Sequence, residues 1–428
     1  MTLLTVKYTR PEEAKLKQRL TEPVRFINIL AGPRQVGKTT IVRDLISPNS
    51  PQGFYISVDE EVVVSPFSKS GNAVSPPQKR DAEWLRYYWH EARNRASKWA
   101  EISLRNSAAP QNEPYIFAVD EIQKIKQWSE IVKGLWDEDR ANGLNMHIVL
   151  LGSAPLLIQK GLTESLAGRY ELMPVTHWGF AEMQQAFDFS LEEFIYFGGY
   201  PGSASLIHDE SRWRSYVRES LIHPNIEKDI VQMVHIKNPA LLKQLFELGC
   251  HYSGQELSLT KIRKVFDENP HVGTLADYLQ LLMQAKLLAG LHKYAAKEIR
   301  KRNSVPKLIV FNTALMSAIQ DYTFAEAQAD RSYWGRLAES CVGAHLLNTS
   351  DGDTQVCYWR DGSDEVDFVL ARGRKLAAIE VKSSANPSRA RGLEIFAQRN
   401  PSAKTILVGA GGIPLAEFLS YPAEHWLS

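Results

Sequence analysis

The chain has 428 residues, of which 44% are hydrophobic and 23% are charged, and these values are ordinary for a soluble globular protein. Such a length predicts two or three domains. A net charge of +1 excludes a strongly basic or acidic protein whose overall charge would identify its partners. The three cysteines form no CxxC pair, which argues against a zinc site and against a disulfide framework.

The sequence contains no run of about 18 apolar residues that could span a membrane. Its first ten residues also lack an apolar stretch of signal-peptide length. We therefore expect a cytoplasmic protein that has no membrane partner.

Strands alternate with helices through the first half of the chain, which predicts a parallel sheet with helices on both faces. The expected strands are residues 24–31, 53–59, 115–119, 147–151 and 171–175. Residues 81–103 are expected to be helical, because Trp84, Tyr88 and Ala92 repeat at helical spacing. Core packing explains these aromatic side chains better than a nucleic-acid surface does.

A complete P-loop motif, G-x-x-x-x-G-K-[ST], follows the first predicted strand and opens a helix. Backbone N–H groups of such a loop and the positive end of the helix face phosphate groups. Lys38 would reach the outer phosphates, and the hydroxyl of Thr39 would coordinate Mg²⁺. The predicted ATP-binding residues are Gly32, Pro33, Arg34, Gln35, Val36, Gly37, Lys38, Thr39 and Thr40.

Two carboxylates, Asp120 and Glu121, end the apolar strand 115–119. Ligands of parallel sheets bind beyond the carboxyl ends of the strands, so Asp120 is expected beside the P-loop, where it would hold Mg²⁺. Glu121 would orient or activate the attacking water. The alternative is that Asp120 caps the following helix.

The strand 147–151 ends in a similar way, with Ser153 two residues beyond it. In the same geometry its hydroxyl would reach the γ-phosphate or the attacking water. A helix cap is the alternative reading, and the two roles are compatible.

Four segments, 32–39, 120–123, 151–154 and 166–169, resemble the AAA-type ATPases of archaea and bacteria that carry a conserved C-terminal domain of unknown function. Segments 196–202 and 334–339 resemble this family too, so the resemblance covers nearly the whole chain. It implies that Arg169 faces the nucleotide as an arginine finger or phosphate sensor. From the sequence alone, Arg169 could equally be a surface or ion-pair arginine.

Residues 178–230 have a mostly helical pattern, which a sharp glycine-rich turn at 197–202 interrupts. Helices at 257–266 and 274–283 and strands at 287–294 and 307–311 then predict a winged helix, whose second helix would enter a major groove. Basic residues between the strands would contact phosphate. These residues are Lys293, Lys297, Arg300, Lys301, Arg302 and Lys307. The alternative is an interdomain spacer with a solvated basic hairpin.

Near the C-terminus, strands around Asp367 and around Glu380 and Lys382 are expected to form a hairpin. Side chains alternate along a strand, so Glu380 and Lys382 share a face that Asp367 can approach. The pattern resembles restriction-endonuclease-like nucleases, which implies a second divalent metal held by the carboxylates, with Lys382 stabilising charge at the phosphate. Glu339, on the preceding helix, would add a third carboxylate. A salt-bridged pair of strands without chemistry is the alternative.

We therefore expect an α/β protein with a P-loop AAA-type ATPase core over residues 1–177 and a helical extension over 178–235. A winged-helix-like module over 236–325 and a restriction-endonuclease-like α/β domain over 326–428 would follow. One fitting function is ATP hydrolysis coupled to a nuclease-like domain that acts on nucleic acid, in genome maintenance or defence. The other is an ATP-driven conformational switch whose degenerate domains bind protein partners or DNA without cleavage. Nucleic acid and further copies of the chain are candidate partners besides ATP.

Overall fold

Two compact units make up the part of the chain that the computed structural model describes. The N-terminal unit is Thr9–Val175, and the C-terminal unit begins at Thr176 and includes Tyr8. The described residues are 8–46, 52–60, 77–105, 114–153, 162, 165–230, 236–266, 269–295, 304–382 and 391–427.

The N-terminal unit is built on a five-stranded sheet with the strand order β2-β3-β4-β1-β5. All of its neighbouring strands are parallel, as the alternation of strands and helices predicts. The strands are β1 (Ile27–Ala31), β2 (Gly53–Ser57), β3 (Tyr115–Asp120), β4 (Met146–Gly152) and β5 (Tyr170–Pro174). The five strands predicted from the sequence are confirmed, with ends that shift by a few residues.

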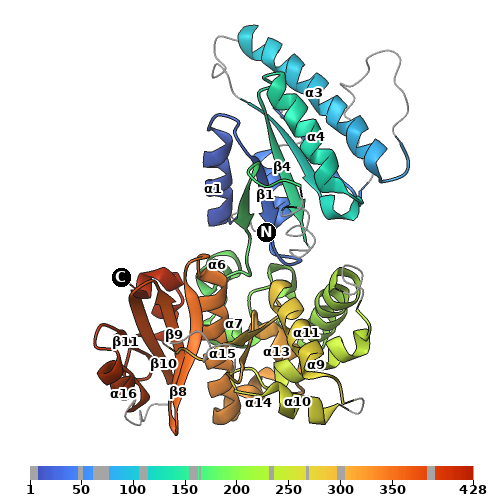
Figure 1. Ribbon diagram of the computed structural model, residues 1–428. Helices are drawn as coiled ribbons and strands as arrows, with labels where there is room; N and C mark the ends of the chain where they lie inside the picture. Colours follow the sequence, from blue (N-terminus) through green and yellow to red (C-terminus); the bar gives the residue numbers. More distant parts are fainter. Residues whose placement is uncertain are drawn as a thin grey trace, which may run out of the picture. The chain divides into compact units, whose positions relative to one another are not determined.

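Helices cover both faces of this sheet (Figure 1). They are α1 (Pro11–Leu20), α2 (Lys38–Leu45), α3 (Ala82–Arg105) and α4 (Trp128–Ala141). Apolar side chains of α1 and α2 form one core with the sheet, and those of α3 and α4 form another. Trp84 and Trp89 of α3 are fully buried in the second core, so the core-packing reading of these aromatics is confirmed.

The C-terminal unit begins with short helices, as the mostly helical pattern after residue 178 predicts. These are α6 (Phe180–Phe187), α7 (Leu191–Phe197) and α8 (Glu210–Tyr216), joined by a 3-10 turn at Pro201–Leu206 and followed by π-helical turns at Val217–Ile222 and Asn225–Ile230. Next come α9 (Pro239–His251), α10 (Leu259–Val265) and α11 (Val272–Gln284), then the antiparallel pair β6 (Leu288–Leu291) and β7 (Lys307–Val310). Helices α10 and α11 followed by a strand pair are in the order expected of a winged helix.

A mixed four-stranded sheet with the order β11-β10-β9-β8 completes this unit. Its strands are β8 (Gln355–Asp361), β9 (Asp364–Arg372), β10 (Lys375–Lys382) and β11 (Lys404–Gly409). The predicted hairpin is the antiparallel pair of β9 and β10, whereas β11 runs parallel to β10. The remaining helices are α13 (Thr313–Ile319), α14 (Phe324–Ala329), α15 (Arg331–Thr349), α16 (Arg391–Arg399) and α17 (Leu415–Phe418).

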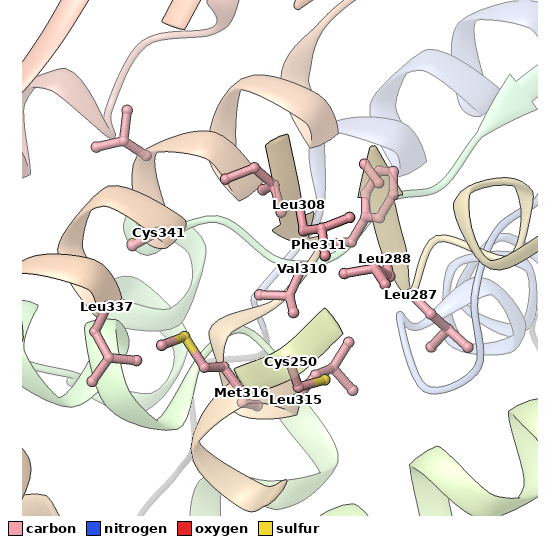
Figure 2. Packing of buried hydrophobic residues seen from close by; sticks show 14 of the residues in the cluster. Cys250, Leu287, Leu288, Leu308, Val310, Phe311, Leu315, Met316, Leu337 and Cys341 are labelled. Atoms are coloured by element: carbon pink, nitrogen blue, oxygen red, sulfur yellow. The ribbon is translucent and has the colours of Figure 1, made fainter. Parts of the chain in front are cut away.

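One large apolar core extends through most of the C-terminal unit, from Phe180 to Leu427, and a smaller one lies between α16 and the strands β8, β9 and β10. Figure 2 shows how Val310 of β7, Met316 of α13 and Cys341 of α15 gather in it. The segments expected to be a separate winged helix and a separate C-terminal domain therefore share one core. Among the described helices, none is long and apolar enough to cross a membrane.

Candidate active site

The predicted nucleotide-binding residues lie in the tight loop between β1 and α2. A Cβ atom on Gly32 would stand 1.9 Å from the carbonyl oxygen of Val175, so only glycine fits where the loop leaves the sheet. Arg10 supports the far side of the loop, because its guanidinium donates to the carbonyl oxygen of Val36 at 2.8 Å. The loop and first turn of α2 contain Gly32, Pro33, Arg34, Gln35, Val36, Gly37, Lys38, Thr39 and Thr40.

The ammonium group of Lys38 lies inside the curve of this loop. Its Nζ donates to the carbonyl oxygens of Gly32 at 2.9 Å and of Pro33 at 2.7 Å, and the residue is buried. A buried charge requires partners, and these carbonyls supply them. The loop therefore holds its positive charge at the place where a P-loop receives phosphate oxygens.

Asp120, at the carboxyl end of β3, links the P-loop to the neighbouring strands. Its Oδ2 accepts hydrogen bonds from the hydroxyls of Thr39 at 2.6 Å and Tyr55 at 2.7 Å, and its Oδ1 accepts one from the backbone N–H of Glu121 at 2.8 Å. Sequence reasoning missed Tyr55. Its position near the end of β2, beside β3, was the available signal, because the carboxyl ends of parallel strands share one edge of a sheet.

Glu121 follows Asp120 in the left-handed region, at φ 55°, where residues other than glycine are uncommon. Its Oε2 accepts hydrogen bonds from the hydroxyl of Ser153 at 2.9 Å and from the amide of Gln123 at 2.5 Å. The structure thus brings Ser153 to Glu121, a contact that neither sequence interpretation contained. Residues 154–161 lie outside the described part of the chain, so the helix-cap reading of Ser153 stays a prediction.

Arg169 lies at the amino ends of the strands, whereas the P-loop lies at their carboxyl ends. Its backbone carbonyl oxygen accepts a hydrogen bond from the N–H of Ile27, at the amino end of β1. At about 3.3 Å per residue, β1 separates this position from Gly32 by about 16 Å. The guanidinium forms a two-point pair with Asp137 of α4, at 2.7 and 3.0 Å. These hydrogen bonds lower the pKa of Asp137. The structure therefore does not bring Arg169 to the P-loop of its own chain.

In the C-terminal unit, the hairpin of β9 and β10 brings Asp367, Glu380 and Lys382 together. Asp367 Oδ2 accepts from the backbone N–H of Val381 at 2.8 Å, and Lys382 Nζ lies 2.6 Å from Glu380 Oε1. Both carboxylates are buried. Burial, together with the charge of Asp367, raises the pKa of Glu380 to about 7.

Lys307, from β7, reaches into the same cluster. Its Nζ lies 2.5 Å from Glu339 Oε1 on α15, 3.5 Å from Asp367 Oδ1 and 3.2 Å from the carbonyl oxygen of Asp367. Burial alone would lower the pKa of Lys307, but the two carboxylates outweigh it, so the pKa is raised. The expectation that Lys307 contacts phosphate from a basic wing is wrong, because its side chain is buried.

The predicted second metal site does not fit this arrangement. A divalent ion such as Mg²⁺ needs several oxygen ligands at about 2.1 Å, and the ammonium of Lys307 stands between Glu339 and Asp367. Two buried carboxylate oxygens of the cluster, Glu380 Oε2 and Glu339 Oε1, have no hydrogen-bond partner among the described residues, and the second is ion-paired with Lys307. No group of three or more His, Cys, Asp or Glu in the described ranges is arranged to hold a metal. The assignment of Glu339, Asp367 and Glu380 as metal ligands is therefore unsupported.

The second helix of the predicted winged helix, α11, presents little that favours DNA. Its exposed residues include Ala276, Asp277, Gln280 and Met283, and the helix carries no Lys or Arg. Recognition helices contact bases and phosphates mainly through basic and amide side chains. The basic residues Lys297, Arg300, Lys301 and Arg302 lie outside the described residues, so the predicted basic wing stays a prediction.

Comparison with protein families divides the chain into three matched stretches. The AAA domain family matches residues 24–184, which include the loop, Asp120, Glu121 and Ser153. Residues 24–184 are a P-loop ATPase domain, and the protein is an ATPase. Two families described as domains of unknown function, DUF8612 and DUF4143, match residues 188–326 and 334–417. Neither description supports the nuclease expected from the sequence.

Two curated relatives are the uncharacterized proteins Mb2031c of Mycobacterium bovis and Rv2008c of Mycobacterium tuberculosis. Each is 23% identical to this chain over 405 residues, which is 93% of this chain and 76% of the relative. Among solved structures, the Walker-type ATPase PABY2304 of Pyrococcus abyssi is 15% identical, with a TM-score of 0.44. That match covers 73% of this chain and 96% of the archaeal one.

In the ATPase domain, Thr39 and Asp120 are the residues that would hold Mg²⁺. Their oxygens come from two elements and lie 2.6 Å apart, and both are hard ligands of the kind that Mg²⁺ prefers. The residues present therefore fit this ion. When bound, Mg²⁺ would neutralise negative charge on the β- and γ-phosphates.

Proposed function

We propose that Glu121 activates the water that attacks the γ-phosphate of ATP, while Lys38 and the loop amides hold the phosphates. The observation that carries this proposal is the fixed carboxylate of Glu121, to which Ser153 and Gln123 both donate. A carboxylate held in this way, at the edge of the sheet where the P-loop lies, is suited to act as a general base.

Each residue has a defined part in this reaction. Lys38 exchanges the carbonyl oxygens of Gly32 and Pro33 for phosphate oxygens when ATP binds. As the water oxygen bonds to the γ-phosphorus, its proton passes to Glu121, the bond from phosphorus to the bridging oxygen breaks, and the electron pair leaves with ADP. Both hydrogen bonds to Glu121 use Oε2, so its other oxygen accepts the proton.

Two substitutions separate binding from hydrolysis. Lys38→Ala removes the phosphate-binding charge, so ATP binding measured by calorimetry should weaken at least about 10-fold. Glu121→Gln keeps the site's shape but removes the base, so it should bind ATP normally and lose about 100-fold or more in turnover.

The exposed residues Lys98 and Glu130 provide the matched controls Lys98→Ala and Glu130→Gln, which should behave like the wild type. Hydrolysis that survives both Lys38→Ala and Glu121→Gln would place the active site elsewhere.

For the C-terminal unit, we propose that it binds a partner, that ATP turnover changes its conformation, and that it is not a nuclease. The observation that argues against a nuclease is the ion pair of Lys307 with Glu339, which engages a carboxylate that a metal-dependent nuclease needs. The lack of Lys and Arg on α11 also weakens the case for a DNA-reading helix. Protein partners, or DNA bound without cleavage, remain the targets of this unit.

The test is cleavage of single-stranded DNA, double-stranded DNA and RNA by the wild type and by Asp367→Ala, with Mn²⁺ and with and without ATP. We expect neither protein to cut any substrate, while both hydrolyse ATP. Cleavage by the wild type that Asp367→Ala lacks would restore the nuclease function for this unit.

A further inference from the structure

Lys307 joins two stretches of the chain that match different families. Its backbone belongs to β7, within residues 188–326, and forms a bridge with Glu256. Its side chain reaches Glu339 and Asp367, which lie within residues 334–417. A side chain from one matched stretch thus completes a buried charge cluster of the other.

Groups on several sides of the Lys307 ammonium fix its position. The carboxylate of Glu339 lies at 2.5 Å, while the side-chain and backbone oxygens of Asp367 lie at 3.5 and 3.2 Å. The ring of Phe368 adds a further attraction, with Nζ 5.1 Å from its centroid. Only 6% of the surface of Lys307 is exposed, so water contributes little to the coordination of this charge.

An ammonium group in this position competes with a divalent ion in two ways. It fills the space between the oxygens of Glu339 and Asp367, which the ion would need at about 2.1 Å. Its positive charge also repels a second cation in a poorly solvated site. Lys382 takes up one oxygen of Glu380 in the same manner, at 2.6 Å. Two lysines thus face the three carboxylates that the nuclease pattern would give to metal.

We propose that Lys307 is a built-in cation that replaces the divalent metal of this cluster and fastens β7 to α15 and β9. The cluster then links β7 permanently to α15 and β9 within the C-terminal unit, and it does not bind Mg²⁺ or Mn²⁺. This inference extends the proposed function, in which the unit does not cleave nucleic acid. It makes a separate claim about metal binding, which is measured without nucleotide, so its failure is distinct from a failure of ATP hydrolysis.

The experiment titrates the full-length protein with Mn²⁺ alone and follows free Mn²⁺ by electron paramagnetic resonance. Wild type and Asp367→Asn should bind the same number of Mn²⁺ ions with the same affinity, because Asp367 holds none. Lys307→Ala should gain one bound Mn²⁺ per chain, because it removes the ammonium and opens space beside the carboxylates of Glu339 and Asp367. The double variant Lys307→Ala/Asp367→Asn should lose that additional ion.

Lys307→Arg is the matched control, since it keeps the charge and should bind no more Mn²⁺ than the wild type. A wild-type Mn²⁺ site that Asp367→Asn removes would overturn the proposal. So would a folded Lys307→Ala protein, judged by circular dichroism, that gains no ion. If Lys307→Ala does not fold, the comparison of wild type with Asp367→Asn still decides whether the native cluster is closed to metal.

Discussion

Tyr55 shares an oxygen of Asp120 with Thr39, and this places it beside the two residues that would hold Mg²⁺. Burial and the nearby charge of Asp120 raise the pKa of Tyr55, so its hydroxyl keeps its proton and donates to the carboxylate. The ring is held in turn by the guanidinium of Arg43, 4.7 Å from its centroid. Tyr55 therefore positions the carboxylate of Asp120.

We predict that Tyr55→Phe raises the Mg²⁺ concentration needed for half-maximal ATP hydrolysis, while turnover at saturating Mg²⁺ changes little. A hydrogen bond to a charged group contributes about 1.5 kcal/mol, which corresponds to about a 10-fold shift. Steady-state ATPase rates across a Mg²⁺ titration measure it, with Tyr252→Phe at an exposed tyrosine as control. An unchanged Mg²⁺ requirement would mean that Thr39 and the backbone alone position Asp120.

His345 in α15 gives the C-terminal unit a calculable sensitivity to acid. Its Nε2 donates to the carbonyl oxygen of Tyr421 at 2.7 Å, and burial lowers its pKa to about 4. The unfolded chain, with a histidine pKa of about 6.5, binds the proton more readily than the folded chain does. The contribution of neutral His345 to the free energy of unfolding is therefore fully present above about pH 6.5 and is lost as the pH falls toward about 4.

The expected loss from His345 alone is about 2 kcal/mol at about pH 5. His345→Gln retains a donor for Tyr421 but has no proton to gain, so its unfolding temperature should fall less between about pH 7 and pH 5 than that of the wild type. Scanning calorimetry at the two pH values measures the difference. Equal acid sensitivity in both proteins would show that other groups carry it.

At the scale of elements, the glycine-rich turn after α7 is held by the cap of a helix far along the chain. Gly198 has φ 69°, and a Cβ atom there would lie 2.0 Å from Asn312 Oδ1, so a side chain cannot be accommodated. Asn312 Oδ1 accepts from the backbone N–H groups of Gly199 and Ala314, both at 3.1 Å. One buried side chain thus caps α13 and fixes the turn.

Asn312→Ala should therefore lower the stability of the protein more than the loss of an ordinary helix cap does. Removing the acceptor leaves two buried N–H groups unpaired, and we expect a loss of about 2–4 kcal/mol from the stability of the C-terminal unit. Ser258→Ala, which removes an exposed cap from α10 alone, should cost about 1 kcal/mol. Chemical denaturation of the three proteins compares them, and equal losses would contradict the dual role of Asn312.

The elements that the sequence predicted best are those whose identity depends on local pattern. The P-loop, its flanking β1 and α2, and the strand ending at Asp120 are encoded by contiguous residues, so their type and order could be predicted. The contact between Lys307 and Asp367 could not be predicted, because the two residues are 60 positions apart and local pattern carries no information on such a contact. The same limit hid the shared core that unites α13, α15 and β7.

At the scale of the whole molecule, the position of Arg169 bears on assembly. Arg169 and the P-loop lie at opposite edges of one sheet, about 16 Å of strand apart, and an arginine side chain does not extend that far. If Arg169 contacts a nucleotide, that nucleotide belongs to a second copy of the chain. Otherwise, its two-point pair with Asp137 is its whole role.

Mixing the variants Arg169→Ala and Lys38→Ala distinguishes these roles. Arg169→Ala keeps an intact P-loop, and Lys38→Ala keeps an intact Arg169, so a mixed assembly contains some complete sites and should regain a measurable part of the wild-type ATPase rate. Asp137→Asn is the control, because it frees Arg169 without removing it and should stay active if the arginine acts on a neighbouring copy. Sedimentation at the assay concentration tells whether the chains associate. Full activity in a monomeric protein, or the same loss in Arg169→Ala and Asp137→Asn, would show that Arg169 serves its own domain through Asp137.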